Sequence, residues 1–153
     1  MAYCDTHLWQ PFLERHGTKL EVIQLVLFWN RIDHANLTTI ANTCPNLIRL
    51  DLGIEAWGWG LFVDAPWHLV VPASVQIIGL RNRYKQSNTQ GYADLFLALE
   101  EMSFGSKLKY IQFIDRCNAI DLREKRPRVL RKGVEMLKKR GLVLWDHEGR
   151  LMG

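Results

Sequence analysis

A spaced apolar motif recurs along the chain and constrains its fold more than any other feature. It consists of an aliphatic residue, two variable residues, a second aliphatic residue, one variable residue and an aliphatic or aromatic residue. It occurs at 20–25, 47–52, 75–80 and 108–113, with starts 27, 28 and 33 residues apart, and a less regular run follows at 142–146. Alternation of this kind indicates strands, and its repetition is typical of units that bury their apolar faces by stacking on one another.

The segments between these strands are mostly helical in pattern, with apolar residues at helical spacing and glycines after several of the expected ends. Helices are predicted at 10–16, 36–44, 88–102 and 126–140. The segment 55–74 is rich in Gly and Pro, which predicts a loop or a short helical turn in place of a helix. The first unit has almost no lead-in, so we expect the N-terminal helix to fray or to pair with upstream sequence.

These patterns together predict an α/β fold, a short solenoid of four to five units with parallel inner strands and outer helices. The whole chain, 1–153, is expected to form one such domain. The expected strands lie near 20–27, 47–53, 75–81, 108–114 and 142–146.

The segment ANTCPNLIRLDL at 41–52 resembles the leucine-rich repeats of F-box proteins. Four further segments are similar to the C-terminal repeat region of fungal F-box/leucine-rich-repeat-like proteins: FLERHGTKLEVIQL, ASVQIIGLR, LKYIQFID and RGLVLWDHEGRLM. The resemblance implies a leucine-rich-repeat-like fold and a role as the substrate-recognition part of a ubiquitin ligase. Family members usually carry an F-box before the repeats, and this chain lacks one. We therefore interpret it as a fragment or a truncated paralogue, which would meet a ligase adaptor only through an upstream F-box.

Composition and cysteine usage exclude several classes of protein. The chain is 48% hydrophobic and 24% charged, which favours a folded domain over disorder. It has no apolar stretch long enough to span a membrane and no secretory signal pattern. Cys4, Cys44 and Cys117 are isolated, so we expect no disulfide framework, metal site or cofactor, and a cytoplasmic or nuclear location.

Candidate catalytic groups are few, and we predict that the protein is not an enzyme. The five histidines are scattered and match no hydrolase, metalloprotease or phosphate-binding motif. The densest titratable cluster is Asp146, His147 and Glu148. It is either an acid/base or metal-binding group or, as we favour, a solvated turn after the last strand.

Partner binding is expected on the inner face of the sheet, where the residues between the core aliphatics alternate outward. The polar residues expected there are Gln24, Arg49, Asp51, Arg81, Tyr110 and Gln112. Their mixed charge and single aromatic suit another protein better than a polyanion. The alternative is an ordinary hydrated sheet face without a ligand.

Two other segments have alternative interpretations. The basic run 125–140 holds eight Lys or Arg and one acid, so it is either the solvated face of an outer helix, which we favour, or a nucleic-acid or anionic-surface site. Trp57, Trp59 and Trp67 either cover the gap left by the missing helix or anchor a partner.

Overall fold

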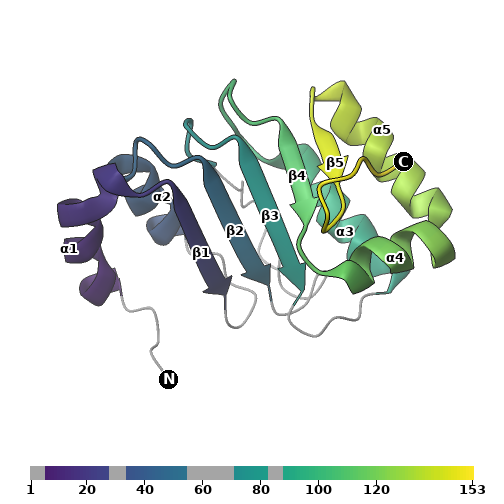
Figure 1. Ribbon diagram of the computed structural model, residues 1–153, viewed down its shortest axis with the longest axis horizontal. Coiled ribbons are helices and arrows are strands. Elements are labelled where there is room, and N and C mark those ends of the chain that lie inside the picture. Colours follow the sequence, from purple (N-terminus) through teal and green to yellow (C-terminus); the bar gives the residue numbers. More distant parts are fainter. Residues whose placement is uncertain (1–5, 28–33, 55–70, 83–87) are drawn as a thin grey trace.

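Five parallel strands form one sheet flanked by helices in the computed structural model shown in Figure 1. The structure describes residues 6–27, 34–54, 71–82 and 88–153. The strands are β1 (Val22–Leu27), β2 (Arg49–Ile54), β3 (Ile77–Asn82), β4 (Tyr110–Phe113) and β5 (Val143–Trp145). The helices are α1 (Thr6–His16), the short 3₁₀ turn η1 (Gly17–Lys19), α2 (His34–Thr43), α3 (Thr89–Glu101), α4 (Arg116–Lys125) and α5 (Pro127–Lys139).

The strands lie in the sheet in the same order as in the sequence, β1-β2-β3-β4-β5, and every neighbouring pair is parallel. Equivalent positions of the repeated motif are therefore neighbours across the sheet. Ile23, Leu50, Ile78, Ile111 and Leu144 form one continuous row. The α/β class, the parallel sheet and all five strands predicted from the sequence are thus confirmed.

A recurrent turn makes each strand start later than its motif predicts. The N–H of the leading aliphatic residue donates to the carbonyl three residues earlier in four units: Leu20 to Gly17, Leu47 to Cys44, Val75 to Pro72 and Leu108 to Gly105. In the fifth unit Leu142 donates to Leu137 at the end of α5. The leading residue therefore closes a turn ahead of the strand, where it is buried in every unit except the first, and ladder pairing begins one or two residues later.

The core lies between the sheet and the helices on one of its faces. The inward residues of β2 to β5 whose burial is described are at most 1% exposed, and they meet apolar side chains such as Leu37 of α2, Leu95 of α3 and Leu137 of α5 in one cluster. In β1, by contrast, the equivalent residues Ile23 and Leu25 are only partly buried. The core side of β1 is thus less completely covered than that of the other four strands.

The predicted helices are confirmed, with two differences. Helix α1 begins at Thr6 rather than residue 10, with Pro11 inside it. Helix α4 was not predicted, because its buried residues Asn118, Ala119 and Leu122 form too short an apolar pattern among charged neighbours. Most of the expected loop at 55–74, including its three tryptophans, lies outside the described residues. None of the described helices has the length and apolar character that a membrane-spanning helix requires.

Candidate functional site

The face of the sheet that points away from the core carries the predicted partner-binding residues. Alternate strand residues point to this face, which we call the sheet face. Its first row is Val22, Arg49, Ile77, Tyr110 and Val143, and its second row is Gln24, Asp51, Gly79, Gln112 and Trp145. Arg81 lies on the same face, one alternation beyond Gly79. All six residues predicted for this surface are therefore on it, each at least partly exposed.

A chain of hydrogen bonds, which we call the polar bridge, crosses the middle of the sheet face. Arg49 donates from Nε to Oδ1 of Asp51 at 2.7 Å and from Nη1 to Oε1 of Gln112 at 2.9 Å. Gln112 donates from Nε2 to the backbone carbonyl of Asp146 at 3.0 Å. The polar bridge thus joins β2 and β4 to the segment after β5, and it holds the Arg49 guanidinium in a fixed position.

Glycine in the middle strand makes the polar bridge possible. A Cβ at Gly79 would lie 2.0 Å from Oδ1 of Asp51 and 2.8 Å from Cδ1 of Ile114. Only a residue without a side chain leaves room for the Asp51 carboxylate and the overlying Arg49 to cross β3.

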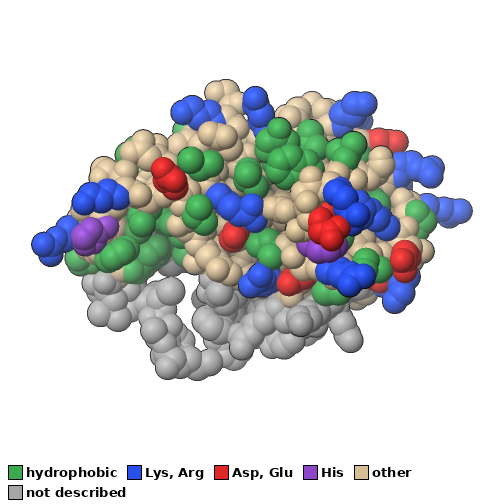
Figure 2. Space-filling view, in the orientation of Figure 1, with side chains coloured by type: hydrophobic (Ala, Val, Ile, Leu, Met, Phe, Trp, Pro, Cys, Tyr) green, Lys and Arg blue, Asp and Glu red, His purple; other side chains and the backbone are tan. Residues whose placement is uncertain are grey.

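Apolar side chains lie beside the polar bridge. The rings of Tyr110 and Trp145 are stacked, with centroids 3.8 Å apart and an interplanar angle of 20°. Val22 is 57% exposed, and Ile77 and Val143 are partly exposed in the same row. Figure 2 shows apolar, basic and acidic side chains mixed on this side of the molecule. The sheet face therefore combines an aromatic stack with a fixed cation.

The carboxyl end of the sheet face carries a second ion pair. Arg81 Nε lies 3.6 Å from Oδ1 of Asp115, which follows β4. Neither Arg81 Nε nor the other Asp115 oxygen has a hydrogen-bond partner, although both atoms are buried. Among the described residues, this pair together with Arg49 and Asp51 gives the sheet face two positive and two negative charges, so its described part is close to electrically neutral.

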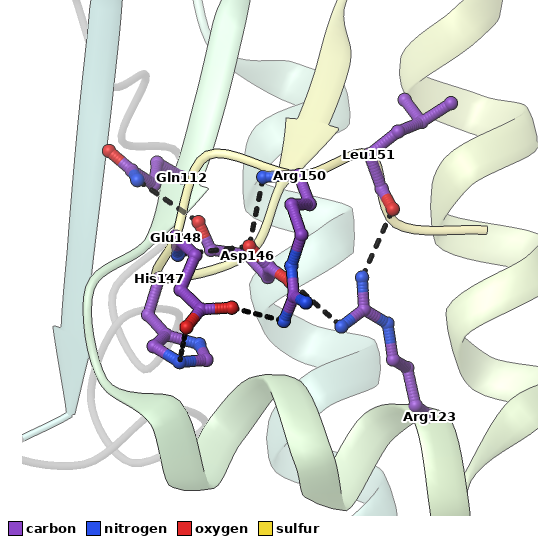
Figure 3. A network of polar contacts seen from close by, with 7 residues as sticks. All are labelled: Gln112, Arg123, Asp146, His147, Glu148, Arg150 and Leu151. Carbon is purple, nitrogen blue, oxygen red and sulfur yellow. Dashed lines mark hydrogen bonds and ion pairs between the residues drawn. The ribbon is translucent and has the colours of Figure 1, made fainter.

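The interpretation of Asp146, His147 and Glu148 as a solvated turn is wrong for Asp146, which is completely buried. Figure 3 shows the polar contacts around its carboxylate. Its Oδ1 accepts from the backbone N–H groups of Glu148 and Arg150, each at 2.9 Å. Its Oδ2 accepts from Arg123 Nη1 at 2.8 Å and Arg150 Nε at 3.2 Å. Four donors thus occupy one carboxylate.

Burial opposes ionisation of Asp146. The hydrogen bonds from the Arg150 N–H, the Arg123 guanidinium and the Glu148 N–H, together with the Arg150 charge, outweigh that effect and hold the pKa of Asp146 well below its ordinary value. His147 Nε2 lies 4.0 Å from Glu148 Oε1, and His147 is not among the four donors to the Asp146 carboxylate. Asp146 is therefore a structural anchor for the chain after β5. The sequence hinted at this only through the turn-forming Gly149, which has a positive φ of 75°.

The cations of the basic run 125–140 fall into two groups: some form ion pairs or hydrogen bonds with the rest of the fold, and the others are exposed on α5. Arg126 pairs with Asp121 at 3.0 Å, Lys125 lies 3.8 Å from the same carboxylate, and Arg140 donates to the carbonyls of Leu99 and Glu100. The other five cations are on α5 and exposed: Arg128, Arg131, Lys132, Lys138 and Lys139. Their position on the outer face of a helix packed through Leu130 and Leu137 confirms the predicted orientation of this helix.

Among the described residues, the cysteines and the other potential metal ligands are not grouped into a metal-binding site. Cys44 is buried in the core, as its place on an apolar stripe predicts, and Cys117 is exposed at the start of α4. Cys4 lies outside the described residues. Within the described ranges, no three His, Cys, Asp or Glu side chains are grouped so that they could hold a metal ion.

No protein-family model, no curated protein and no solved structure matches this chain.

Proposed function

We propose that this chain is a non-catalytic protein-interaction module that binds another protein through the sheet face. The observation that carries the proposal is an all-parallel sheet with helices packed against one face and exposed side chains on the other. Parallel sheets are usually covered on both faces, so a face that none of the described helices covers, and that carries apolar residues, favours a binding surface.

The residue types on the sheet face support a protein as the partner. Tyr, Trp and Arg dominate the energetics of protein interfaces, and here Tyr110, Trp145 and Arg49 lie within one polar and apolar surface. The polar bridge orders Arg49 before binding, which lowers the entropy that association would otherwise cost. The near-neutral charge of this face argues against a polyanion as its ligand.

We further propose that the fold is a leucine-rich-repeat-like solenoid. The sequential strand order and the turn repeated ahead of four strands support this arrangement. With the resemblance to F-box proteins, this makes substrate recognition within a ubiquitin ligase our preferred biological role. A ligase adaptor would then contact an F-box in a longer chain, and the sheet face would hold the substrate.

The test compares capture of a partner by two variants with the same change in charge. The chain is immobilised and exposed to nuclease-treated lysate of its source cells. Arg49→Glu with Arg81→Glu changes the sheet face, whereas Arg131→Glu with Lys132→Glu changes α5. We expect a discrete protein to be retained by the wild type and the α5 variant and lost with the sheet-face variant.

A third variant controls for local unfolding of the sheet-face variant. Such unfolding could occur because Arg49→Glu places a second carboxylate beside Asp51. Tyr110→Ala removes half of the aromatic stack and leaves the polar bridge intact, and it should also weaken capture strongly. Equal capture by the wild type and all folded variants, checked by circular dichroism, would exclude the sheet face as the binding surface.

A further inference from the structure

The outer face of α5 has an arrangement of charge that the sequence alone does not resolve. Its five exposed cations occur at positions three, four and seven residues apart, which places them on one side of the helix. Glu135 is the one acidic residue in α5. Figure 2 shows Lys and Arg side chains gathered along the rim where Figure 1 places α5. Glu135 is exposed and lies among these cations, four residues from both Arg131 and Lys139, so the α5 stripe has a net positive charge and contains one carboxylate.

The cations of the α5 stripe are not used by the fold. Among the described residues, no ion pair involves Arg128, Arg131, Lys132, Lys138 or Lys139. The protein does pair the neighbouring Arg123, Arg126 and Arg140 with carboxylates or helix carbonyls. Solubility accounts for isolated surface charges, but five unpaired cations in one line also create a local field that attracts an anion of matching length.

The dimensions of the α5 stripe fit a row of phosphates. From Arg128 to Lys139 the helix rises about 16 Å, at about 1.5 Å per residue. A nucleic-acid duplex carries one charge about every 1.7 Å of its axis, so about nine phosphates of its two strands lie along this length and about half of them face one side. The five cations are therefore comparable in number to the phosphates that one side of a duplex presents over the same span.

Two features favour a duplex over other anions. No aromatic residue occurs in α5, so the stripe lacks the rings on which the bases of a single strand would stack. Acidic side chains flank the stripe, with exposed Glu100 on α3 and exposed Glu124 on α4. A broad anionic membrane would meet these flanking carboxylates as well as the cations, whereas the convex surface of a duplex meets only the narrow stripe, in which Glu135 is the one carboxylate.

We propose that the α5 stripe binds the phosphate backbone of double-stranded nucleic acid without reading its sequence. This binding is separate from the sheet face, because the stripe lies on the outer side of a helix that packs against α3 and β5. The protein thus has two independent surfaces, one for a protein and one for a polyanion.

The experiment measures binding of a fluorescent 20-base-pair DNA duplex of mixed sequence as the salt concentration is raised. With five phosphates neutralised, the logarithm of the association constant should fall with the logarithm of salt with a slope of about −4.5. Arg131→Gln with Lys132→Gln should reduce the magnitude of the slope by about 1.8 and weaken binding at every salt concentration. Both side chains are exposed, so the melting temperature should not change.

The matched control neutralises two exposed cations at the opposite end of the molecule. Arg15→Gln with Lys19→Gln, on α1 and η1, makes the same change in net charge and should leave the slope unchanged. Equal effects of the two double variants, or no duplex binding at low salt, would overturn the proposal. Vesicles of equal parts phosphatidylcholine and phosphatidylserine form the last arm, and binding to these vesicles without binding to the duplex would also overturn it.

Discussion

Removal of the Asp146 carboxylate should destabilise the protein more than any single surface change. In Asp146→Ala, the backbone N–H groups of Glu148 and Arg150 lose their acceptor, and Arg123 loses its partner. Truncating one partner of a fully buried ion pair costs about 3–5 kcal/mol. Arg123 is one-third exposed and regains water, so we expect a loss of about 2–4 kcal/mol in the free energy of unfolding.

Asp146→Asn distinguishes the hydrogen bonds donated by backbone N–H groups from those donated by the guanidinium groups of Arg123 and Arg150. Its amide oxygen can still accept from the two backbone N–H groups, while its NH₂ group faces the guanidinium donors. The loss should therefore be smaller than for Asp146→Ala, and Glu148→Ala, at an exposed position, should change stability by less than about 0.5 kcal/mol. Urea unfolding followed by tryptophan fluorescence measures all three. A loss below about 1 kcal/mol for Asp146→Ala would refute the account of this anchor.

The pH dependence provides an independent check. Because the pKa of Asp146 is lower in the folded state than its ordinary value of 3.8, folding favours the ionised carboxylate. Its contribution is complete above pH 3.8 and is lost as the pH falls towards the folded-state pKa. The stability difference between wild type and Asp146→Asn should thus be constant near neutral pH and shrink in acid. A difference that stays constant into strong acid would contradict the assignment.

Three further predictions follow from the packing. Gly79→Ala should displace the Asp51 carboxylate, break the polar bridge and weaken capture of the partner, with a stability loss of about 1–2 kcal/mol in urea unfolding. Gly17→Ala should cost about 1–3 kcal/mol in the same assay, because its Cβ would lie 2.1 Å from the Thr43 carbonyl oxygen. Amide hydrogen exchange should be faster in β1 than in β4, since the core side of β1 is only partly covered; equal protection would contradict this.

The strands were predictable because a period-two apolar pattern was repeated, and repetition makes each unit support the others. The strand starts were less predictable, since a leading aliphatic such as Leu47 is equally apolar whether it closes a turn or enters the ladder. Helix α4 was missed for a related reason. It buries only three residues, so its sequence shows little helical periodicity.

The positions of the residues in the candidate site were predictable from the sequence, whereas the hydrogen bonds between them were not. Side-chain alternation places Arg49, Asp51 and Gln112 on one face once the strands are known. The polar bridge between them depends on the register of β2, β3 and β4, which brings Gly79 between Asp51 and Gln112. The burial of Asp146 was unpredictable, because it depends on Arg123, 23 residues away in the helix that the sequence did not predict.

The most direct test of the central claim places a photo-crosslinking amino acid on either side of the molecule. Position 22, occupied by the exposed Val22, lies on the sheet face, and position 97, occupied by the half-exposed Leu97, lies on α3. Each variant is irradiated in nuclease-treated lysate of the source cells, and the adducts are separated by mass. We expect a discrete protein adduct from position 22 and none from position 97. Adducts of the same pattern from both positions, or an adduct from position 97 alone, would contradict the sheet face as the binding surface.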